Sequence, residues 1–406
     1  MRNIDTTVRY PGFTYHESHF ALAAYTLESS VIRDILKYSS QPGVISFAGG
    51  LPAPELFPVE ELKAAADRAL LQHGSLALQY GLSAGYGPLR EFLAERVSRQ
   101  TGTTISGNDI IITGGSQQGL DMVGRVFLEP GRYVLCSRPT YLGALQAFNY
   151  YQAKYATVEM DDDGMIVDDL EEKIKAHHPA LIYVVPNFQN PNGVTLTSER
   201  RFKLVELACT YNVPIIDDNP YGELRYAGEH QVSLKQIGQD AVIQLGTFSK
   251  IVSPGLRIGW IVAPPAVMSV LERVKQATDL HTNQFAQYVV HEYVIEGRLE
   301  QHIERLIRAY RERRNAMLAA MSEFFPDTVT WTRPEGGLFL WVTLPEGVVA
   351  RELFFKAIEQ KVAFVHGLPF DPLGKMINTL RLNFSNASLE LIREGVKRLG
   401  RVFAEL

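Results

Sequence analysis

Between residues 110 and 263 the chain alternates short apolar segments, typical of strands, with longer amphipathic segments, typical of helices. The strand-like segments comprise residues 110–113, 133–136, 181–185, 213–217, 242–246 and 258–263. Short, continuously apolar strands are buried on both faces, and strands that alternate with helices pair in parallel. The alternation therefore predicts an α/β fold in which helices cover both faces of a mainly parallel sheet.

The pattern changes after Pro265, where a helical region rich in arginine and glutamate runs to about residue 324. Two more strand-like segments, 338–344 and 379–384, follow with a helix between them and predict a smaller α+β domain. The start of the chain carries one helical segment and then several glycines and prolines, which predict an extended arm. We therefore divide the chain into three parts, which are an N-terminal arm with part of the small domain (1–57), a large domain (58–290) and a small C-terminal domain (291–406).

The composition argues against several classes of protein. The 406 residues are 46% hydrophobic, which is enough for a large core, and a net charge of −5 argues against nucleic-acid binding. No uncharged apolar run approaches the ~20 residues that cross a membrane, and no signal peptide is visible. The two cysteines, Cys136 and Cys209, suit a reducing compartment, so we expect a cytoplasmic protein. The histidines lack the spacing of metal ligands, and no metal site is expected.

Four polar clusters follow the predicted strands, at the edge of a parallel sheet where ligands bind. They are Gly-Gly-Ser-Gln at 114–117, Asn-Pro-Asn-Gly at 190–193, Asp-Asp-Asn-Pro-Tyr at 217–221, and Thr-Phe-Ser-Lys at 247–250 with Arg257 beyond it. Each of the first three also fits an ordinary turn, because glycine, proline, asparagine and aspartate are turn residues. In the fourth, a lysine beside two hydroxyls and an arginine suits an anion site that contains an amine.

Taken together, these clusters resemble the motifs of the fold type I aminotransferases that use pyridoxal phosphate (PLP). The shared order is N-P-x-G, then D-x-x-Y, then S-K with an arginine seven residues on, then R-x-N-F at 381–384. The segments SFAGGLPAPELFP and LQYGLSAGYGPLREFLAER resemble the aminoadipate/kynurenine, multi-substrate branch of that family. The resemblance covers nearly the whole chain and implies a seven-stranded type of sheet and a homodimer. It also implies amino-group exchange between an amino acid (2-aminoadipate, aromatic or branched-chain) and a 2-oxo acid, with 2-oxoglutarate as the expected acceptor.

The resemblance implies three catalytic residues, which are Lys250, Asp218 and Tyr221. Lys250 would hold the cofactor as a Schiff base and then carry the substrate's α-proton. Asp218 would keep the ring nitrogen protonated. Asp217 competes for that role, but the family spacing of three between aspartate and tyrosine selects Asp218 with Tyr221. Tyr221 and Asn190 would hydrogen-bond the O3′ oxygen of the ring.

The same resemblance assigns the remaining contacts to the cofactor. The residues implied at the phosphate are Ser116, Gln117, Thr247, Ser249 and Arg257. Hydroxyls, helix-end amides and a planar guanidinium are groups that commonly bind phosphate. Tyr141 would stack on the pyridine ring, although an aromatic at this place also fits ordinary core packing. Tyr80 matches a tyrosine that the family lends to the phosphate of the neighbouring subunit, so each active site would require a dimer.

For the substrate, the resemblance implies Arg381 at the α-carboxylate, together with Asn190 and Gly50. A guanidinium presents two parallel N–H donors, which fix the orientation of a carboxylate. We propose Arg33, on the expected arm helix, for the distal carboxylate of an acidic substrate. The alternative is that Arg33 and Asp34 belong to a solvated helix face.

Two other functions fit the same scaffold. One is a PLP-dependent lyase or decarboxylase, against which Arg381 argues because it favours reactions that keep the carboxylate bound. The other is a non-catalytic ligand sensor joined to a DNA-binding segment. We expect too few residues before Ser46 for a winged-helix domain and a linker.

Overall fold

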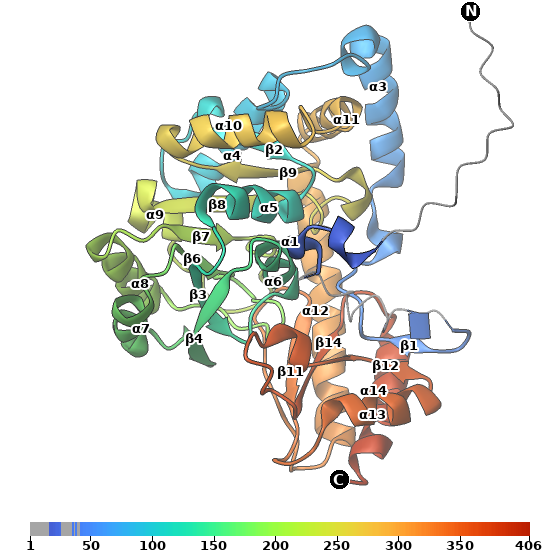
Figure 1. Cartoon of the computed structure of the whole chain (residues 1–406). Coiled ribbons are helices and arrows are strands. Elements are labelled where there is room, and N and C mark those ends of the chain that lie inside the picture. Colours follow the sequence, from blue (N-terminus) through green and yellow to red (C-terminus); the bar gives the residue numbers. More distant parts are fainter. Residues whose placement is uncertain (1–15, 26–34, 36, 39–40) are drawn as a thin grey trace, which may run out of the picture.

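The computed structural model describes residues 16–25, 35, 37–38 and 41–406 (Figure 1). Its largest sheet has eight strands in the order β2-β9-β8-β7-β6-β3-β4-β5. These strands are β2 (Ile110–Thr113), β9 (Gly259–Val262), β8 (Val242–Thr247), β7 (Ile215–Asp218), β6 (Leu181–Val184), β3 (Tyr133–Arg138), β4 (Lys154–Asp161) and β5 (Gly164–Met165). All six strands predicted between residues 110 and 263 are present, whereas β4 and β5 were not among the predictions.

Strand direction agrees with the prediction of a mainly parallel sheet. Strands β8, β7, β6, β3 and β4 pair in parallel, while β9 lies antiparallel to both β8 and β2, and β5 forms a hairpin with β4. The carboxyl ends of β6, β7 and β8 therefore lie side by side at one edge of the sheet.

Helices cover both faces of this sheet, and the alternation of side chains along the strands supplies a separate core to each face. Along β6, Ile182 and Val184 pack with α7 (Leu170–His177), α8 (Ser198–Thr210) and α9 (Leu234–Gly238). The neighbouring Leu181 and Tyr183 face the opposite core, to which α5 (Ser116–Phe127) and α6 (Leu142–Asn149) contribute. Alternate residues of a strand point to opposite faces, so consecutive residues at a strand end reach different cavities.

Four further helices frame the β2 edge of the sheet. They are α3 (Val59–Ala77), α4 (Gly87–Thr101), α10 (Pro265–Thr278) and α11 (Gln284–Val294). Helix α11 packs on α3 and α4, and α10 packs on α5 and β2. In Figure 1 these helices lie together at the side of the molecule away from the C-terminus.

The C-terminal part follows the long helix α12 (Leu299–Phe324). It contains a four-stranded antiparallel sheet in the order β10 (Thr330–Trp331), β11 (Phe339–Thr343), β14 (Thr379–Asn383) and β13 (Val365–His366). Helices α13 (Ala350–Glu359) and α14 (Leu389–Phe403) complete this part. The predicted α+β character is confirmed, and strands β11 and β14 match the two predicted segments.

Near the N-terminus, η1 (Glu17–His19) and α1 (Leu22–Tyr25) precede β1 (Ile45–Ser46). Strand β1 pairs in parallel with β12 (Val362–Ala363), which joins the arm to the C-terminal part. The boundaries at residues 57 and 290 stay a prediction. In the described part of the chain, no helix is both long enough and apolar enough to cross a membrane, and no cluster of three potential metal ligands occurs.

Candidate active site

A cavity of about 250 Å³ lies at the carboxyl ends of β6, β7 and β8. Among the predicted site residues that the structure describes, all except Tyr80 line this cavity. They are Gly50, Ser116, Gln117, Tyr141, Asn190, Asp218, Tyr221, Thr247, Ser249, Lys250, Arg257 and Arg381, joined by Val185, Pro220 and Pro254. Segments that are up to 331 residues apart in the sequence, from Gly50 to Arg381, thus meet at one place.

Lys250 lies in the turn that follows β8 and is partly open to this cavity. Its Nζ donates a hydrogen bond of 2.9 Å to the carbonyl oxygen of Gly50. Burial, together with the positive charges of Arg381 and Arg257, lowers the pKa of Lys250 to about 8. A larger fraction of this amine is therefore neutral near pH 7 than for an ordinary lysine, and a neutral amine is the form that acts as nucleophile or base.

The two adjacent aspartates at the end of β7 point to different sides of the sheet. Asp218 lines this cavity, whereas Asp217 lines a second cavity on the other side and accepts a 3.1 Å hydrogen bond from Gln244. Asp218 accepts a 2.8 Å hydrogen bond from the Tyr183 hydroxyl at Oδ2, while its Oδ1 is buried without a partner. Burial, opposed by the Tyr183 hydrogen bond and assisted by the nearby Asp217, raises the pKa of Asp218 to about 7. A buried carboxylate oxygen that has no hydrogen-bond partner is suited to accept from a cationic N–H group.

The turn between β2 and α5 forms an anion-binding cradle at one end of the cavity. Arg257 donates from Nη2 to the carbonyl oxygen of Gly114 over 2.7 Å. Gly115 has φ +88°, and a Cβ there would lie 2.5 Å from Arg257 Nη2, so only glycine leaves room for the guanidinium. Ser116 begins the 12-residue helix α5, and its Oγ is buried without a partner. A free hydroxyl, a helix N-terminus and an arginine together suit a phosphate group.

Arg381 lies on β14 at the opposite side of the cavity, and it is only 1% exposed. Its Nη1 donates to Asn190 Oδ1 over 2.8 Å and its Nη2 donates to the Ala48 carbonyl oxygen over 2.6 Å. The guanidinium carbon lies 4.4 Å from the ring centroid of Phe339 and 5.0 Å from that of Phe370. Burial lowers the pKa of Arg381 to about 10, which still leaves it charged at pH 7. The described residues place no carboxylate on this buried charge, so the site is suited to a carboxylate ligand.

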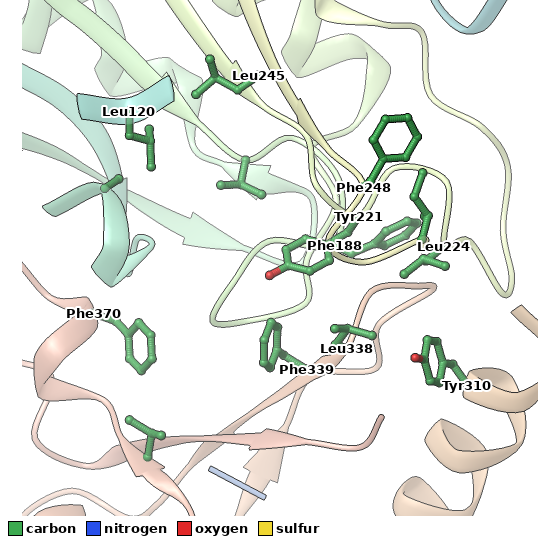
Figure 2. Close-up of a cluster of buried hydrophobic side chains, with 14 of the residues drawn as sticks. Leu120, Phe188, Tyr221, Leu224, Leu245, Phe248, Tyr310, Leu338, Phe339 and Phe370 are labelled. Carbon is green, nitrogen blue, oxygen red and sulfur yellow. The ribbon is translucent and has the colours of Figure 1, made fainter. Parts of the chain in front are cut away.

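Tyr221 lines the same cavity, and its ring meets that of Phe339 edge to face with 5.9 Å between the ring centroids (Figure 2). Burial raises the pKa of Tyr221, and a hydrogen bond with Asn190 partly opposes the rise. Tyr141 also lines the cavity, and burial, with a smaller effect of Asp218, raises its pKa to about 12. Both hydroxyls are therefore neutral hydrogen-bonding groups at pH 7.

Of the predicted site residues that the structure describes, Tyr80 is not among those that line the cavity. Tyr80 is 78% exposed, and its ring lies edge-on to His281 with 5.7 Å between centroids. Arg33 falls outside the described residues. Tyr183 is a residue that motif reading missed, because it lies within an apolar strand and belongs to no motif. Its contact with Asp218 follows from the sheet register, which the structure supplies. In the register of β6 with β7, Tyr183 lies opposite Ile216, two residues before Asp218 and therefore on the same face.

Comparison with known proteins identifies the family. Residues 43–399 match the family model described as aminotransferase class I and II, so the chain belongs to this family. Aromatic-amino-acid aminotransferase 1 of Thermococcus litoralis is 47% identical over 96% of this chain and 95% of its own length.

Two solved structures extend the match. The multiple substrate aminotransferase of Thermococcus profundus superposes with a TM-score of 0.92 at 44% identity. An α-aminoadipate aminotransferase of Thermus thermophilus, complexed with N-(5′-phosphopyridoxyl)-L-leucine, does so with a TM-score of 0.90 at 41% identity. Each match covers 96% of this chain and 98% of the other. The predicted membership of the aminoadipate/kynurenine branch is confirmed.

The protein is therefore a PLP-dependent aminotransferase that exchanges an amino group between an amino acid and a 2-oxo acid. The cavity fits this cofactor by its own chemistry. Among its buried polar atoms without partners, Asp218 Oδ1 suits a ring N–H group and Ser116 Oγ suits a phosphate oxygen. Glycine at position 115 lets the Arg257 guanidinium lie beside this turn, since a Cβ there would be 2.5 Å from its Nη2. When bound, PLP delocalises the electrons left behind when the substrate loses its α-proton.

Proposed function

We propose that Lys250 is the residue that links the cofactor and moves the substrate's α-proton, with Arg381 holding the α-carboxylate. The observation that carries this proposal is that one cavity contains the Lys250 amine, the Arg381 guanidinium and the partnerless oxygen of Asp218. Arg381 would orient the substrate so that its Cα–H bond points at Nζ of Lys250, and orientation of this kind contributes strongly to the rate. The neutral amine of Lys250, whose N–H donates to the Gly50 carbonyl oxygen, would accept the proton from Cα on its lone pair.

Asp218 would hold a proton on the ring nitrogen through its free Oδ1, while Tyr183 holds Oδ2 in place. Tyr221 and Asn190 would donate hydrogen bonds to the O3′ oxygen, and Tyr141 would lie against the ring. Ser116, Gln117, Thr247, Ser249 and Arg257 would bind the phosphate. These assignments are supported by the position of every one of these residues around the same cavity, except Tyr183, which lies behind Asp218.

The proposed substrates are 2-aminoadipate, aromatic and branched-chain amino acids, with 2-oxoglutarate as the acceptor. Support comes from the names of the relatives, one of which acts on aromatic amino acids, one on multiple substrates and one on aminoadipate. A half-reaction screen tests this. The PLP enzyme is mixed with one amino acid at a time, and conversion of the bound cofactor to its pyridoxamine form is followed by absorbance. Failure of all three substrate groups to convert it would overturn the proposal.

Specificity for acidic substrates would come from Arg33, which lies outside the described residues. Losing a charged partner in an occluded site costs roughly 2–5 kcal/mol, or about 30-fold to a few thousand-fold in affinity. Arg33→Ala should therefore weaken glutamate, 2-oxoglutarate and 2-aminoadipate, and leave leucine and phenylalanine within a few-fold of wild type. Arg381→Ala is the matched control, since it should weaken all substrates alike. Equal losses across substrates in Arg33→Ala would show that this residue does not bind the side chain.

The proposed assembly is a homodimer in which Tyr80 reaches the phosphate of the neighbouring subunit. The segment around Tyr80 supports this, because it exposes several large apolar side chains and soluble monomers rarely expose large apolar patches. The exposed side chains close to Tyr80 in the sequence include Leu71, Leu76, Leu78 and Leu82. Mixing Lys250→Ala with Tyr80→Ala should restore part of the activity, since one of the two sites in a mixed dimer is intact. No recovery despite demonstrated subunit exchange would contradict the shared site. A cytoplasmic location stays a prediction from the composition.

A further inference from the structure

Lys275, near the end of α10, has a side chain that is completely buried, with 0% exposed. Its Nζ donates three hydrogen bonds, to Gln118 Oε1 at 2.7 Å, Asp279 Oδ2 at 2.9 Å and Thr282 Oγ1 at 2.7 Å. Three oxygens match the three donors of an ammonium group, so the buried charge is fully hydrogen-bonded. A buried lysine is costly for a fold unless it is paired in this way. Lys275 is not among the residues that line the active-site cavity.

The partners of Lys275 connect it to the phosphate-binding turn. Gln118 Oε1, which accepts from Lys275, also accepts a 2.7 Å hydrogen bond from the backbone N–H of Gly114. The carbonyl oxygen of the same Gly114 accepts from Arg257. Thr282 Oγ1 donates to the carbonyl oxygen of Ile112, at the end of β2. The peptide groups of Gly114 and Ile112 are therefore each linked to the same ammonium group through one side chain.

We infer that Lys275 is a positioning residue for the cofactor phosphate. It acts through Gln118 on Gly114, and through Gly114 on Arg257. Without the ammonium group, Gln118 Oε1 and Thr282 Oγ1 lose a charged donor and the turn loses its fixed orientation. Arg257 and the first residues of α5 would then no longer converge on one point. The inference rests on the proposed phosphate site and adds a residue to it that makes no contact with cofactor or substrate.

The test compares PLP with pyridoxal, which has the same ring and aldehyde but no phosphate. Full-length chain is stripped of cofactor, and the dissociation constant of each compound is measured by absorbance titration for wild type and Lys275→Met. We expect the dissociation constant of PLP to rise about 10-fold or more in the variant, because the loss of a hydrogen bond to a charged group has an effect of this size. The dissociation constant of pyridoxal should stay unchanged, because it has no group at the turn.

Lys235 provides a matched control, since it is also a buried lysine, 5% exposed. Its Nζ donates to the carbonyl oxygens of Gln239 and Val242, at the amino end of β8 and thus at the other end of the strand from Thr247. Lys235→Met should lower the melting temperature as Lys275→Met does, but it should leave both dissociation constants unchanged. This separates a general loss of stability from an effect on the phosphate.

A second variant, Gln118→Leu, removes the relay together with the 2.8 Å hydrogen bond from Gln118 Nε2 to Asp279 Oδ2, and leaves Lys275 with Asp279 and Thr282. Gln118→Leu should reproduce the selective loss of PLP affinity. If Lys275→Met does not fold, the two dissociation constants of Gln118→Leu test the inference on their own. The inference is overturned if PLP and pyridoxal weaken equally, if neither weakens, or if Lys235→Met gives the same selective loss. Failure of the wild-type chain to bind PLP would instead overturn the proposed function itself.

Discussion

The adjacent aspartates of β7 make a sharp prediction about stability in the presence and absence of the cofactor. Burial raises the pKa of Asp218 from 3.8 to about 7. A carboxyl group whose pKa is raised in the folded state stabilises the fold below its unfolded pKa, and that contribution is lost as the pH rises through the folded value. The difference between a pKa of 3.8 in the unfolded chain and about 7 in the folded protein corresponds to roughly 4 kcal/mol of unfolding free energy, which is lost between pH 4 and pH 8. In Asp218→Asn this loss disappears, so the cofactor-free variant should be more stable than wild type at pH 8.

With the cofactor bound, wild type should instead be more stable than Asp218→Asn at pH 8. A protonated ring nitrogen opposite Oδ1 favours the charged carboxylate and offsets the cost of burying it. The increase in unfolding free energy on adding PLP should therefore be larger at pH 8 than at pH 5 in wild type. In Asp218→Asn, the increase should be smaller than in wild type and should depend less on pH. Urea unfolding at the two pH values, with and without PLP, measures all of these quantities.

Asp217→Asn is the matched control. Burial raises the pKa of Asp217 to about 6, so its removal should also stabilise the cofactor-free protein at pH 8, by roughly 3 kcal/mol at most. Because Asp217 faces the other cavity and acts on Asp218 only through its charge, the increase caused by PLP should change far less than in Asp218→Asn. The reasoning is refuted if Asp217→Asn loses the cofactor-dependent increase while Asp218→Asn keeps it. It is also refuted if cofactor-free Asp218→Asn is less stable than wild type at pH 8.

Two further predictions concern residues of the same cavity. Borohydride reduction of the wild-type enzyme should attach the cofactor to Lys250, as peptide mapping would show, and a label on another lysine would overturn the site. Lys250→Ala should still bind PLP through the phosphate contacts, but without turnover. Tyr183→Phe removes the hydrogen bond that opposes the raised pKa of Asp218, and should weaken PLP binding by about 10-fold, the worth of a hydrogen bond to a charged group. An unchanged dissociation constant in Tyr183→Phe would show that Asp218 is held without this hydroxyl.

The cavity was predictable from the sequence because its residues lie next to recognisable strand ends. Asp218 ends one apolar strand, and Lys250 comes three residues after the end of another. The carboxyl ends of neighbouring parallel strands must meet at one edge of the sheet, so these residues converge whatever the details of the loops. The choice of Asp218 over Asp217 rested on motif spacing alone. In the structure the two consecutive residues face opposite sides of the sheet, and Asp218 is the one that lines this cavity, while its role at the ring nitrogen stays a prediction.

Strand β4 shows where the strand pattern failed. Its sequence, KYATVEMD, alternates buried and exposed residues near the edge of the sheet, and it does not resemble the continuously apolar strands beside it. The criterion of short apolar runs selects central strands, which are buried on both faces, and passes over strands with one open face. The antiparallel direction of β9 was equally unreadable, because an antiparallel strand covered on both faces has the same apolar composition as a parallel one.

The residues that hold the active-site groups in place were beyond sequence reading for a different reason. Tyr183 meets Asp218 across 35 residues of sequence, and Lys275 meets Gln118 across 157. Neither belongs to a motif, because each partner's identity depends on which side chains the fold brings together. A tyrosine in an apolar strand and a lysine in an amphipathic helix have common interpretations as core and as surface. Only the completed fold shows that Tyr183 donates to Asp218, which lines the cavity, and that Lys275 donates to Gln118, which accepts from the Gly114 N–H in the turn before α5.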